Sequence, residues 1–467
     1  MLTYSFEQAR DKPLYEYLYE RIRQDILTGR LKAGEKLPSK RSLARNLGVS
    51  TITIEGAYGQ LAAEGYCQSQ PRRGFFVADV LRASVAEPVR HSSKMTAQPA
   101  KGKIEWFADF ASNGVQKDLF PFDTWTRLLR KVVADDAEAL LSKSPSFGVM
   151  MLRQAIAEHL HSFRGLVVSP EQIVIGAGTE YLYNLLVQFF GRDKRFAVEN
   201  PGYDRIRKIY AACGADCVSA DMDEQGVKLS ELAEKQVQIL HISPSHHFPT
   251  GIIMPVSRRY ELLGWAAADA GRYIIEDDYD SEFRLAGRPI PTMMGIDVSG
   301  HVIYMNTFSK SLTPTIRISY MVLPQELAVP FREKLGFYSC TVSNFEQYTL
   351  ARFIQDGYFE KHINRMRNFY RHKRENLLSM LKQSPAAKRL EIIEHGSGLH
   401  FLLRLALDVS DRQFCEKLAA CGIRLHALSE YYEGEPAECR HTFVLNYSGV
   451  RDDALAEAVH RFSACLC

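Results

Sequence analysis

Apolar side chains recur at helical spacing near the start of the chain. Leu14, Leu18, Ile22 and Ile26 follow one another at intervals of four residues, and the repeat stops at Gly29. Residues at this spacing share one face of a helix, and glycine commonly follows the last turn. The pattern predicts a helix that begins near Leu14 and packs through this face.

Two shorter helices and a hairpin follow. Pro38–Ser39 begins a short helix that ends at Gly48, and Ser50 can cap a third helix that stops near Gly65. The turn Pro71–Gly74 then separates two short runs of strand-like residues. Three helices and a hairpin in this order predict a small α+β domain.

The rest of the chain shows two further patterns. Residues 79–107 mix alanine, serine, proline and charged residues without an apolar period, which predicts a flexible linker. Residues 108–467 alternate strand-like runs with helical stretches, which predicts an α/β fold with a mostly parallel sheet. The strand-like runs are Gln172–Ile175, Arg195–Val198, Gln238–Ile242, Tyr273–Glu276 and His301–Tyr304.

Composition and length change this picture little. The 467 residues are 46% hydrophobic and 24% charged, which excludes disordered and collagen-like chains and favours two or three domains. No apolar run is long enough to cross a membrane, the first residues lack a signal-peptide pattern, and the nine cysteines form no CxxC motif. We therefore expect a cytoplasmic protein with free thiols, no metal site and no membrane partner. Residues 1–78 hold twelve basic and eight acidic residues, which is compatible with nucleic-acid binding.

The two short helices separated by Gly48–Val49 have the order of a helix-turn-helix. The segment from Ser50 to about Glu64 would be the recognition helix, whose first residues enter the major groove of DNA. Hydroxyls there can contact base edges or phosphates, while basic residues beside the turn and at the hairpin tip suit phosphates. The candidate DNA-binding residues are Lys40, Arg41, Arg45, Ser50, Thr51, Thr53, Arg72 and Arg73. A three-helix protein-interaction domain is the alternative.

An ordered series of short motifs covers this segment. It comprises PSKRSLA at residues 38–44, LGVS at 47–50, EGY at 64–66 and RGFFV at 73–77. In this order the motifs resemble the GntR family of winged-helix regulators. The resemblance implies that Arg41, the start of the recognition helix and the wing contact a double-stranded DNA operator. Thr51 and Glu55 depart from it, because several such regulators have arginine early in this helix, and Glu55 would repel a phosphate.

A lysine flanked by hydroxyl groups marks a candidate cofactor site. Thr307–Lys310 follows a predicted strand, and a lysine there can form a Schiff base with an aldehyde cofactor. The neighbouring hydroxyls, with Arg317 seven residues after the lysine, can hold a phosphate. A serine–lysine pair on its own is more often a solvated surface feature, so this interpretation depends on the surrounding motifs.

Three acids and a tyrosine follow another predicted strand, within Ile274–Tyr279. In open α/β sheets, ligands bind at the carboxyl ends of the strands. A buried carboxylate there can pair with the ring nitrogen of pyridoxal phosphate (PLP), and a phenol can bond its ring hydroxyl. A solvated acidic loop or a divalent-metal site are the alternatives. Metal is disfavoured because no histidine or further acid accompanies these acids at ligand spacing.

Three further motifs lie between residues 175 and 251. Ile175–Glu180 combines a strand end, a glycine-rich turn and a helix start, which suits a phosphate better than a dinucleotide. Asn200–Tyr203 can present an aromatic ring that stacks on PLP. Ser243–Gly251 is a rigid loop of proline and glycine after a strand.

The five motifs, in this order, resemble fold-type I aminotransferases over residues 108–467. Joined to the GntR-like segment, they resemble the MocR/GabR-type regulators. The resemblance implies an α+β winged helix-turn-helix domain at 1–78, a linker at 79–107 and an α/β PLP-binding domain at 108–467. That domain would have a large part at about 120–330 and a small α+β part at about 340–467.

The resemblance also implies roles for individual residues. Lys310 would form the Schiff base with PLP, and Asp277, in preference to Asp278, would pair with the pyridine nitrogen. Tyr279 would bond the ring hydroxyl, and Tyr203 would stack on the ring. The phosphate-binding residues would be Gly178, Thr179, Thr307, Ser309 and Arg317.

Several positions depart from the aminotransferase pattern. Phe248 stands where many of these enzymes have the asparagine of an Asn-Pro-Thr-Gly motif, so His247 is expected to substitute at the ring hydroxyl. Val444 stands at the position of the arginine that clamps the substrate carboxylate, and Glu430 at an arginine position of GABA-responsive members. Glu430 would repel an acid but can hold an ammonium group, whereas Arg205 can still pair with an acid.

These features favour a PLP-dependent, DNA-binding transcriptional regulator. It would sense an amine or amino-acid-like effector, or PLP itself, through an aldimine at Lys310, with at most weak transaminase activity. The alternatives are a catalytically active aminotransferase with an accessory DNA-binding head, and an interaction module that has lost PLP. The resemblance also implies a homodimer in a head-to-tail, domain-swapped arrangement. The identity of the effector and the operator sequence stay open.

Overall fold

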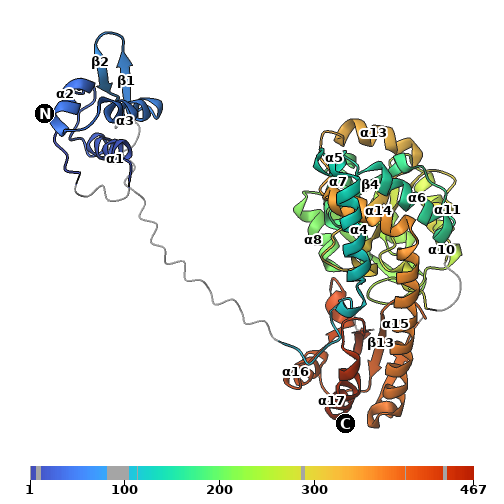
Figure 1. Ribbon diagram of the computed structural model, residues 1–467. Helices are drawn as coiled ribbons and strands as arrows, with labels where there is room; N and C mark the ends of the chain where they lie inside the picture. The colour runs from blue at the N-terminus through green and yellow to red at the C-terminus, as the bar shows by residue number, and fades with distance from the viewer. Residues whose placement is uncertain are drawn as a thin grey trace. The chain divides into compact units, whose positions relative to one another are not determined.

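The computed structural model describes residues 2–6, 12–80, 105–112, 114–285, 290–394, 396–434 and 439–466. These residues belong to two compact units, divided between Lys103 and Ile104 (Figure 1). Most of the predicted linker at 79–107 lies outside the described residues. In the described part, no helix is long and apolar enough to cross a membrane.

The first unit is a winged helix-turn-helix, as the sequence predicts. Its helices are α1 (Leu14–Leu27), α2 (Lys40–Leu47) and α3 (Thr51–Ala63), and its wing is the antiparallel pair β1 (Cys67–Gln70) and β2 (Gly74–Val77). Local chemistry determines the helix ends. Ser39 and Ser50 each accept a hydrogen bond from a first-turn backbone N–H, and Gly48 ends α2 in the left-handed region at φ 67°.

One apolar core holds the three helices of this unit together. Leu18, Ile22, Leu43, Ile54 and Leu61 are completely buried in it. These residues come from all three helices, so the helical spacing in the sequence and the packing agree. The sequence predicts Leu14 on the buried face of α1, but this residue is 42% exposed and the buried face begins at Leu18.

The second unit contains an eight-stranded sheet in the order β4-β11-β10-β9-β8-β5-β6-β7. The five strands from β10 to β6 are parallel, whereas β11 and β7 run antiparallel to their neighbours, so the sheet is mostly parallel, as predicted. The bounds are β4 Ile173–Gly176, β5 Arg195–Asn200, β6 Asp216–Asp223, β7 Gly226–Val227, β8 Ile239–Ile242, β9 Tyr273–Asp277, β10 Val302–Thr307 and β11 Ser319–Val322.

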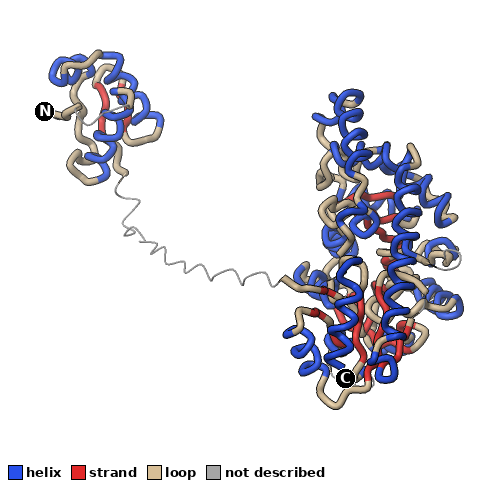
Figure 2. The backbone as a smooth tube through the Cα atoms, turned by 60° about the horizontal axis from the view of Figure 1, so that its bottom comes forward, coloured by secondary structure: helices blue, strands red, loops and turns tan. Residues whose placement is uncertain are grey.

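Helices cover both faces of this sheet, and Figure 2 shows the red strands enclosed by blue helices. Ile173 and Ile175 of β4 pack in one apolar cluster, whereas Val174 between them packs in another. A strand buried on both faces explains the continuous apolar runs of the sequence. The helices are α4 Phe122–Asp135, α5 Ala137–Leu141, α6 Met150–Arg164, α7 Thr179–Phe190, α8 Asp204–Ala212, α9 Leu229–Glu234, α10 Val256–Ala267, α11 Met293–Ile296, α12 Phe308–Ser311, α13 Gln325–Leu335 and α14 Asn344–Gln355.

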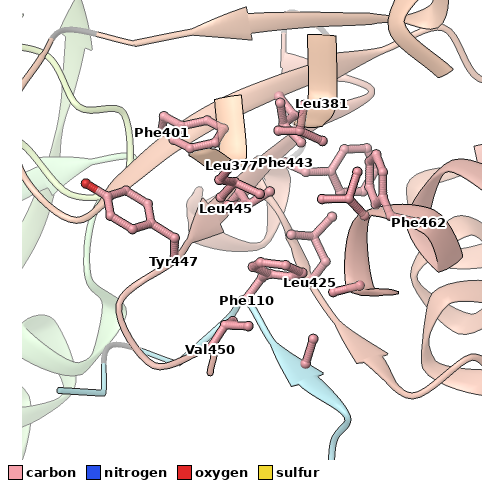
Figure 3. Close-up of a cluster of buried hydrophobic side chains, with 14 of the residues drawn as sticks. Phe110, Leu377, Leu381, Phe401, Leu425, Phe443, Leu445, Tyr447, Val450 and Phe462 are labelled. Atoms are coloured by element: carbon pink, nitrogen blue, oxygen red, sulfur yellow. The ribbon is translucent and has the colours of Figure 1, made fainter. Parts of the chain in front are cut away.

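A smaller α+β part completes the second unit. Its four-stranded antiparallel sheet has the order β12-β13-β16-β15, and a separate short pair joins β3 to β14. Figure 3 shows its core, in which Phe401, Phe443 and Phe462 lie among aliphatic side chains. The bounds are β3 Ala108–Asp109, α15 Tyr358–Gln383, β12 Leu390–Ile393, β13 His400–Leu405, α16 Asp411–Ala420, β14 Ile423–Arg424, β15 His426–Ala427, β16 Thr442–Asn446 and α17 Leu455–Leu466.

Candidate functional site

A cavity of about 210 Å³ lies at the carboxyl ends of the parallel strands. This edge of an open α/β sheet is where ligands bind, because strand ends and helix starts converge there. The cavity brings together residues from motifs that lie far apart in the sequence. Its lining is Thr179, Tyr183, Val198, Glu199, Gly202, Tyr203, Ile206, His241, Ser243, Phe248, Asp277, Tyr279, Thr307 and Lys310.

Lys310 lies on the short helix α12, directly after β10. The hydroxyl of Thr307 accepts a hydrogen bond from the Ser309 backbone N–H and fixes the start of this helix. Burial lowers the pKa of Lys310 to about 8, against a smaller opposing effect of Asp280. A lysine with this pKa is partly neutral near neutral pH, and only the neutral amine attacks an aldehyde.

Asp277 is the last residue of β9, and two side chains contact one of its carboxylate oxygens. The Tyr183 hydroxyl donates a hydrogen bond to Asp277 Oδ2 at 2.8 Å, and His241 Nε2 lies 3.4 Å from the same oxygen. The other oxygen, Oδ1, is buried and has no hydrogen-bond partner among the described residues. Buried carboxylate oxygens normally have donors, so Oδ1 is ready for the N–H of a ligand.

Asp278 faces a different environment. It forms a buried ion pair with Arg164 at 2.7 Å and accepts a hydrogen bond from the Tyr304 hydroxyl at 2.7 Å. It is absent from the cavity lining, whereas Asp277 is part of it. The two neighbouring acids therefore differ in their surroundings, because successive side chains along an extended backbone point to opposite sides.

The predicted phosphate end is built by a glycine turn and the start of α7. Gly178 has φ 93°, and a Cβ there would lie 2.4 Å from Arg317 Nη2, so only glycine lets the guanidinium approach. Arg317 donates to Glu180 Oε2 at 3.2 Å and has a left-handed backbone at φ 50°. The N–H groups of the first turn of α7, beginning at Thr179, suit an anion.

The aromatic residue predicted to stack, Tyr203, also lines the cavity. Its ring meets Phe248 edge-on with centroids 6.0 Å apart, and 46% of it is exposed. Arg205, two residues on, is absent from this lining and pairs with Glu180 at 2.8 Å. Tyr203 is therefore part of the cavity lining, whereas Arg205 lies outside that lining in an ion pair with Glu180.

The structure changes the expectation for His247. This side chain does not line the cavity but lies 2.7 Å from the Thr250 hydroxyl and 3.5 Å from Glu199 Oε2. Burial lowers its pKa to about 3, so it is neutral. The histidine beside Tyr279 is His246, whose Nδ1 lies 3.3 Å from the Tyr279 hydroxyl and 2.7 Å from Asp280 Oδ2. His246 and His247 are adjacent in the sequence but have different partners, because the packing of their loop turns His246 toward Tyr279 and His247 toward Thr250.

Glu430 lies at a neighbouring pocket that shares Glu199 and Tyr203 with the main cavity. Its carboxylate accepts a hydrogen bond from the Ala427 backbone N–H at 2.9 Å and pairs with His426 at 2.7 Å. Partial burial would raise the pKa of Glu430, but these two contacts outweigh it and lower the pKa.

Val444 is buried in β16 and packs with Leu402 and Leu428. The position at which the sequence resemblance places the carboxylate-binding arginine of many aminotransferases is therefore apolar in this chain. Within the described ranges, Lys310 is the one lysine or arginine that lines the cavity.

Sequence reasoning did not find several residues of the site. Tyr183 lies one helical turn after Thr179 on α7, and His241 is a polar residue within a buried strand, so each carried a weak signal. Glu199 carried a similar one, and burial raises its pKa to about 8. Both His241 and Glu199 are polar residues inside an apolar strand, and this pattern could have identified them from the sequence.

The first unit exposes most of its predicted DNA-binding residues. Arg72 lies at the tip of the wing with φ 61°, and Lys40 is paired with Glu55 at 2.5 Å. Glu55 therefore has an ion-pair partner within the protein, and its repulsion of a phosphate stays a prediction. The exposed members of the set are Arg41, Arg45, Ser50, Thr51, Arg72 and Arg73, while Lys40 and Thr53 are half-buried.

Comparisons with known proteins agree with this division. Residues 14–77 match the family of bacterial regulatory proteins, gntR family, and residues 108–462 match aminotransferase class I and II. The chain is 38% identical over 463 residues to the HTH-type transcriptional regulator YdeL of Bacillus subtilis, covering 99% of both chains. It is 31% identical to the probable rhizopine catabolism regulatory protein MocR of Rhizobium meliloti, covering 97% of this chain and 94% of that one.

Solved structures show the same fold in the second unit. Kynurenine aminotransferase of Pyrococcus horikoshii superposes with a TM-score of 0.67 and 24% identity, covering 78% of this chain and 91% of that one. At this identity the likeness concerns the fold of the second unit alone.

Proposed function

Because this chain belongs to the MocR-type transcriptional regulators, in which a GntR-family helix-turn-helix is joined to an aminotransferase class I and II domain, we propose that it senses an amine or amino-acid-like ligand, or PLP itself, through PLP held at Lys310. As a member of this family it is a DNA-binding transcriptional regulator. We assign DNA binding to residues 1–78, the linker to 79–107 and effector sensing to 108–467.

One observation carries the proposal: Lys310 and Asp277, whose carboxylate has a buried oxygen without a partner among the described residues, line the same cavity. This oxygen is Asp277 Oδ1. Leaving a buried acceptor without a donor costs about 1–3 kcal/mol, which a protonated ring nitrogen would recover. PLP, when bound, supplies an electron-withdrawing ring that carries an aldehyde, and this aldehyde condenses with primary amines.

The surrounding residues fit the rest of this cofactor. Tyr183 and His241 both contact Asp277 Oδ2 and leave Oδ1 without a partner among the described residues. Tyr203 would stack on the ring, and Tyr279 would meet the ring hydroxyl with His246 and Asp280 behind it. The phosphate would be held by the first turn of α7, the hydroxyls of Thr307 and Ser309, and the guanidinium of Arg317.

The cavity is better suited to sensing an amine than to turning over ordinary amino acids. Binding and orienting a substrate carboxylate is part of the rate of transamination. Val444 offers no charge for this task, and Arg205 is already paired with Glu180. We therefore expect at most weak transaminase activity. From the fold-type I resemblance we also propose a homodimer.

Reductive trapping tests the assignment of Lys310. The full chain is incubated with PLP, reduced with borohydride, digested and mapped by mass spectrometry. The modification is expected on Lys310 and on no other lysine at comparable yield, and Lys310→Ala should abolish it. Lys373 offers a matched control, because it is also buried but pairs with Asp452 at 3.0 Å. Lys373→Ala should leave the yield at Lys310 unchanged, whereas a yield spread evenly over surface lysines refutes the assignment.

A further inference from the structure

The outer face of the recognition helix α3 has an unusual composition. Ile54, Ala57 and Leu61 are completely buried and define the inner face. The opposite side begins with Ile52, which is 80% exposed although it is one of the most apolar residue types. Positions 52, 55 and 59 share this outer face, because residues three and four apart are neighbours on a helix. Ile52 therefore projects from the first turn of α3, the part of the helix that enters the major groove.

Two of the three hydroxyl groups at this end of α3, those of Ser50 and Thr53, are engaged within the helix itself. Ser50 Oγ accepts a hydrogen bond from the Thr53 backbone N–H at 3.1 Å and lies 2.9 Å from Thr53 Oγ1. Two of the side chains that the sequence suggests for base contacts thus form the N-cap. Thr51 is left as the exposed hydroxyl beside Ile52.

The one charged side chain on this face is also engaged. Glu55 pairs with Lys40 of α2 at 2.5 Å, and Lys40 Nζ lies 5.5 Å from the centre of the Phe75 ring in the wing. Gly59 has no side chain, and a Cβ there would meet nothing within 4 Å. From Thr51 to Gly59 the sequence contains no arginine, lysine, asparagine or glutamine.

This composition limits what the helix can read. Guanine is most often recognised by arginine or lysine, which donate to its O6 and N7. Adenine is most often recognised by asparagine or glutamine, which donate to its N7 and accept from its N6 amino group. Thymine instead presents a 5-methyl group in the major groove, which apolar side chains contact. We propose that Ile52 is a specificity-determining residue that reads the 5-methyl group of a thymine in the operator. The proposal goes beyond amine sensing and does not depend on PLP.

The expected loss of DNA affinity corresponds to the removal of one methyl group from a contact that excludes water. Burying a single methyl or methylene group corresponds to about a four-fold change in affinity. Removing the methyl group from the correct thymine should therefore weaken binding about three- to five-fold. The same change should have little effect once the side chain of Ile52 is shortened, because the partner of the methyl group is then missing.

A double-mutant cycle between protein and DNA tests this directly. Operator sequences are first selected from random duplexes with the full chain, with and without PLP. Each thymine of the selected site is then replaced singly by deoxyuridine, which removes only the methyl group. Dissociation constants are measured by fluorescence anisotropy for the wild type and Ile52→Ala. We expect one thymine per half-site at which deoxyuridine weakens wild-type binding about three- to five-fold and Ile52→Ala binding less than 1.5-fold.

Leu141→Ala provides the matched control. Leu141 is 84% exposed, similar to Ile52, but lies in the second unit. This variant should bind DNA like the wild type and show the same loss with deoxyuridine. The proposal is overturned if no deoxyuridine weakens wild-type binding, or if the wild type and Ile52→Ala lose the same factor at every position. Should Ile52→Ala fold poorly, the wild-type series can still overturn the proposal, by showing no loss with deoxyuridine at any position.

Discussion

Burial governs the chemistry of the individual residues around the cavity. It lowers the pKa of the Lys310 amine to about 8 and raises the pKa of the Glu199 carboxyl to about 8. Both changes favour the neutral form, because a charged group loses its hydration when it is buried. The same lysine on the surface would be charged at any physiological pH, so the position in the fold creates its reactivity.

The pKa of Lys310 predicts how fast PLP attaches at different pH values. The neutral amine is the nucleophile, so the rate at low, fixed PLP should follow the neutral fraction, which rises as pH passes through about 8. That fraction increases roughly ten-fold between pH 7 and pH 9 and then levels off. Stopped-flow absorbance on the cofactor-free full chain measures the rate. A rate that keeps rising ten-fold per pH unit above pH 9 would mean an ordinary, unshifted lysine.

Asp277 and Asp278 predict opposite effects of the same substitution. Asp277→Asn keeps an acceptor for Tyr183 but removes the charge offered to a ring nitrogen, so PLP affinity should fall about 10- to 100-fold with little loss of stability. Asp278→Asn leaves the buried Arg164 without its counter-charge and should cost about 3 kcal/mol of stability.

Equilibrium PLP titration and urea unfolding of both variants check this pair of predictions. Each variant serves as the control for the other, because the two positions are adjacent and the chemical change is identical. Equal losses of PLP affinity in the two variants would contradict the assignment of Asp277.

At the scale of elements, the start of α7 depends on one glycine. Gly178 has φ 93° and ψ 161°, a region that other residues hardly adopt, and a Cβ there would collide with the Arg317 guanidinium. Gly178→Ala should therefore weaken PLP binding at least ten-fold by disturbing the phosphate end of the site. Isothermal titration of the full chain with PLP measures this loss.

Gly165→Ala is the matched control for this substitution. Gly165 ends α6 with φ 66°, and a Cβ there would meet nothing within 4 Å. The variant should lose about 1 kcal/mol of stability from backbone strain and bind PLP normally. If Gly178→Ala behaves in the same way, α7 does not hold the phosphate.

The sequence predicts the elements better than it predicts their contacts. Serine caps, glycine ends and apolar spacing are local signals, and they locate α1, α2 and α3 and the parallel strands within a few residues. The partners of the two acids are not local. Tyr183 lies 94 residues from Asp277 in the chain and contacts it only once the sheet has formed. The choice between His246 and His247 depends in the same way on loop packing, which no periodicity records.

The candidate site shows the same division. Motif order identifies Lys310, Asp277, Tyr203 and Tyr279 as cavity or near-cavity residues, and the structure brings them together. Glu430 could be located from the sequence but its bond to the Ala427 backbone N–H could not, because that contact belongs to a turn in the small part. Side-chain partners across elements are therefore the part that needs the structure.

At the scale of the whole molecule, regulation requires a coupling between the two units. A ligand changes DNA binding only if it has different affinities for two states of the protein. The coupling is reciprocal, so an amine that changes DNA affinity by some factor has its own affinity changed by the same factor when DNA binds. If the effector is sensed as we propose, the change in the second unit begins with the bond at the Lys310 amine.

The response of DNA affinity to PLP and amines tests sensing through Lys310 most directly. Fluorescence anisotropy gives the dissociation constant for the selected operator without PLP, with PLP, and with PLP plus each of a panel of primary amines that includes ethanolamine, taurine, 1,4-diaminobutane, GABA and both alanine enantiomers. We predict that PLP, or PLP with at least one of these amines, shifts the dissociation constant of the wild type at least five-fold and leaves Lys310→Ala unchanged. An equal shift in Lys310→Ala, or a wild type that responds to nothing, would contradict sensing through Lys310.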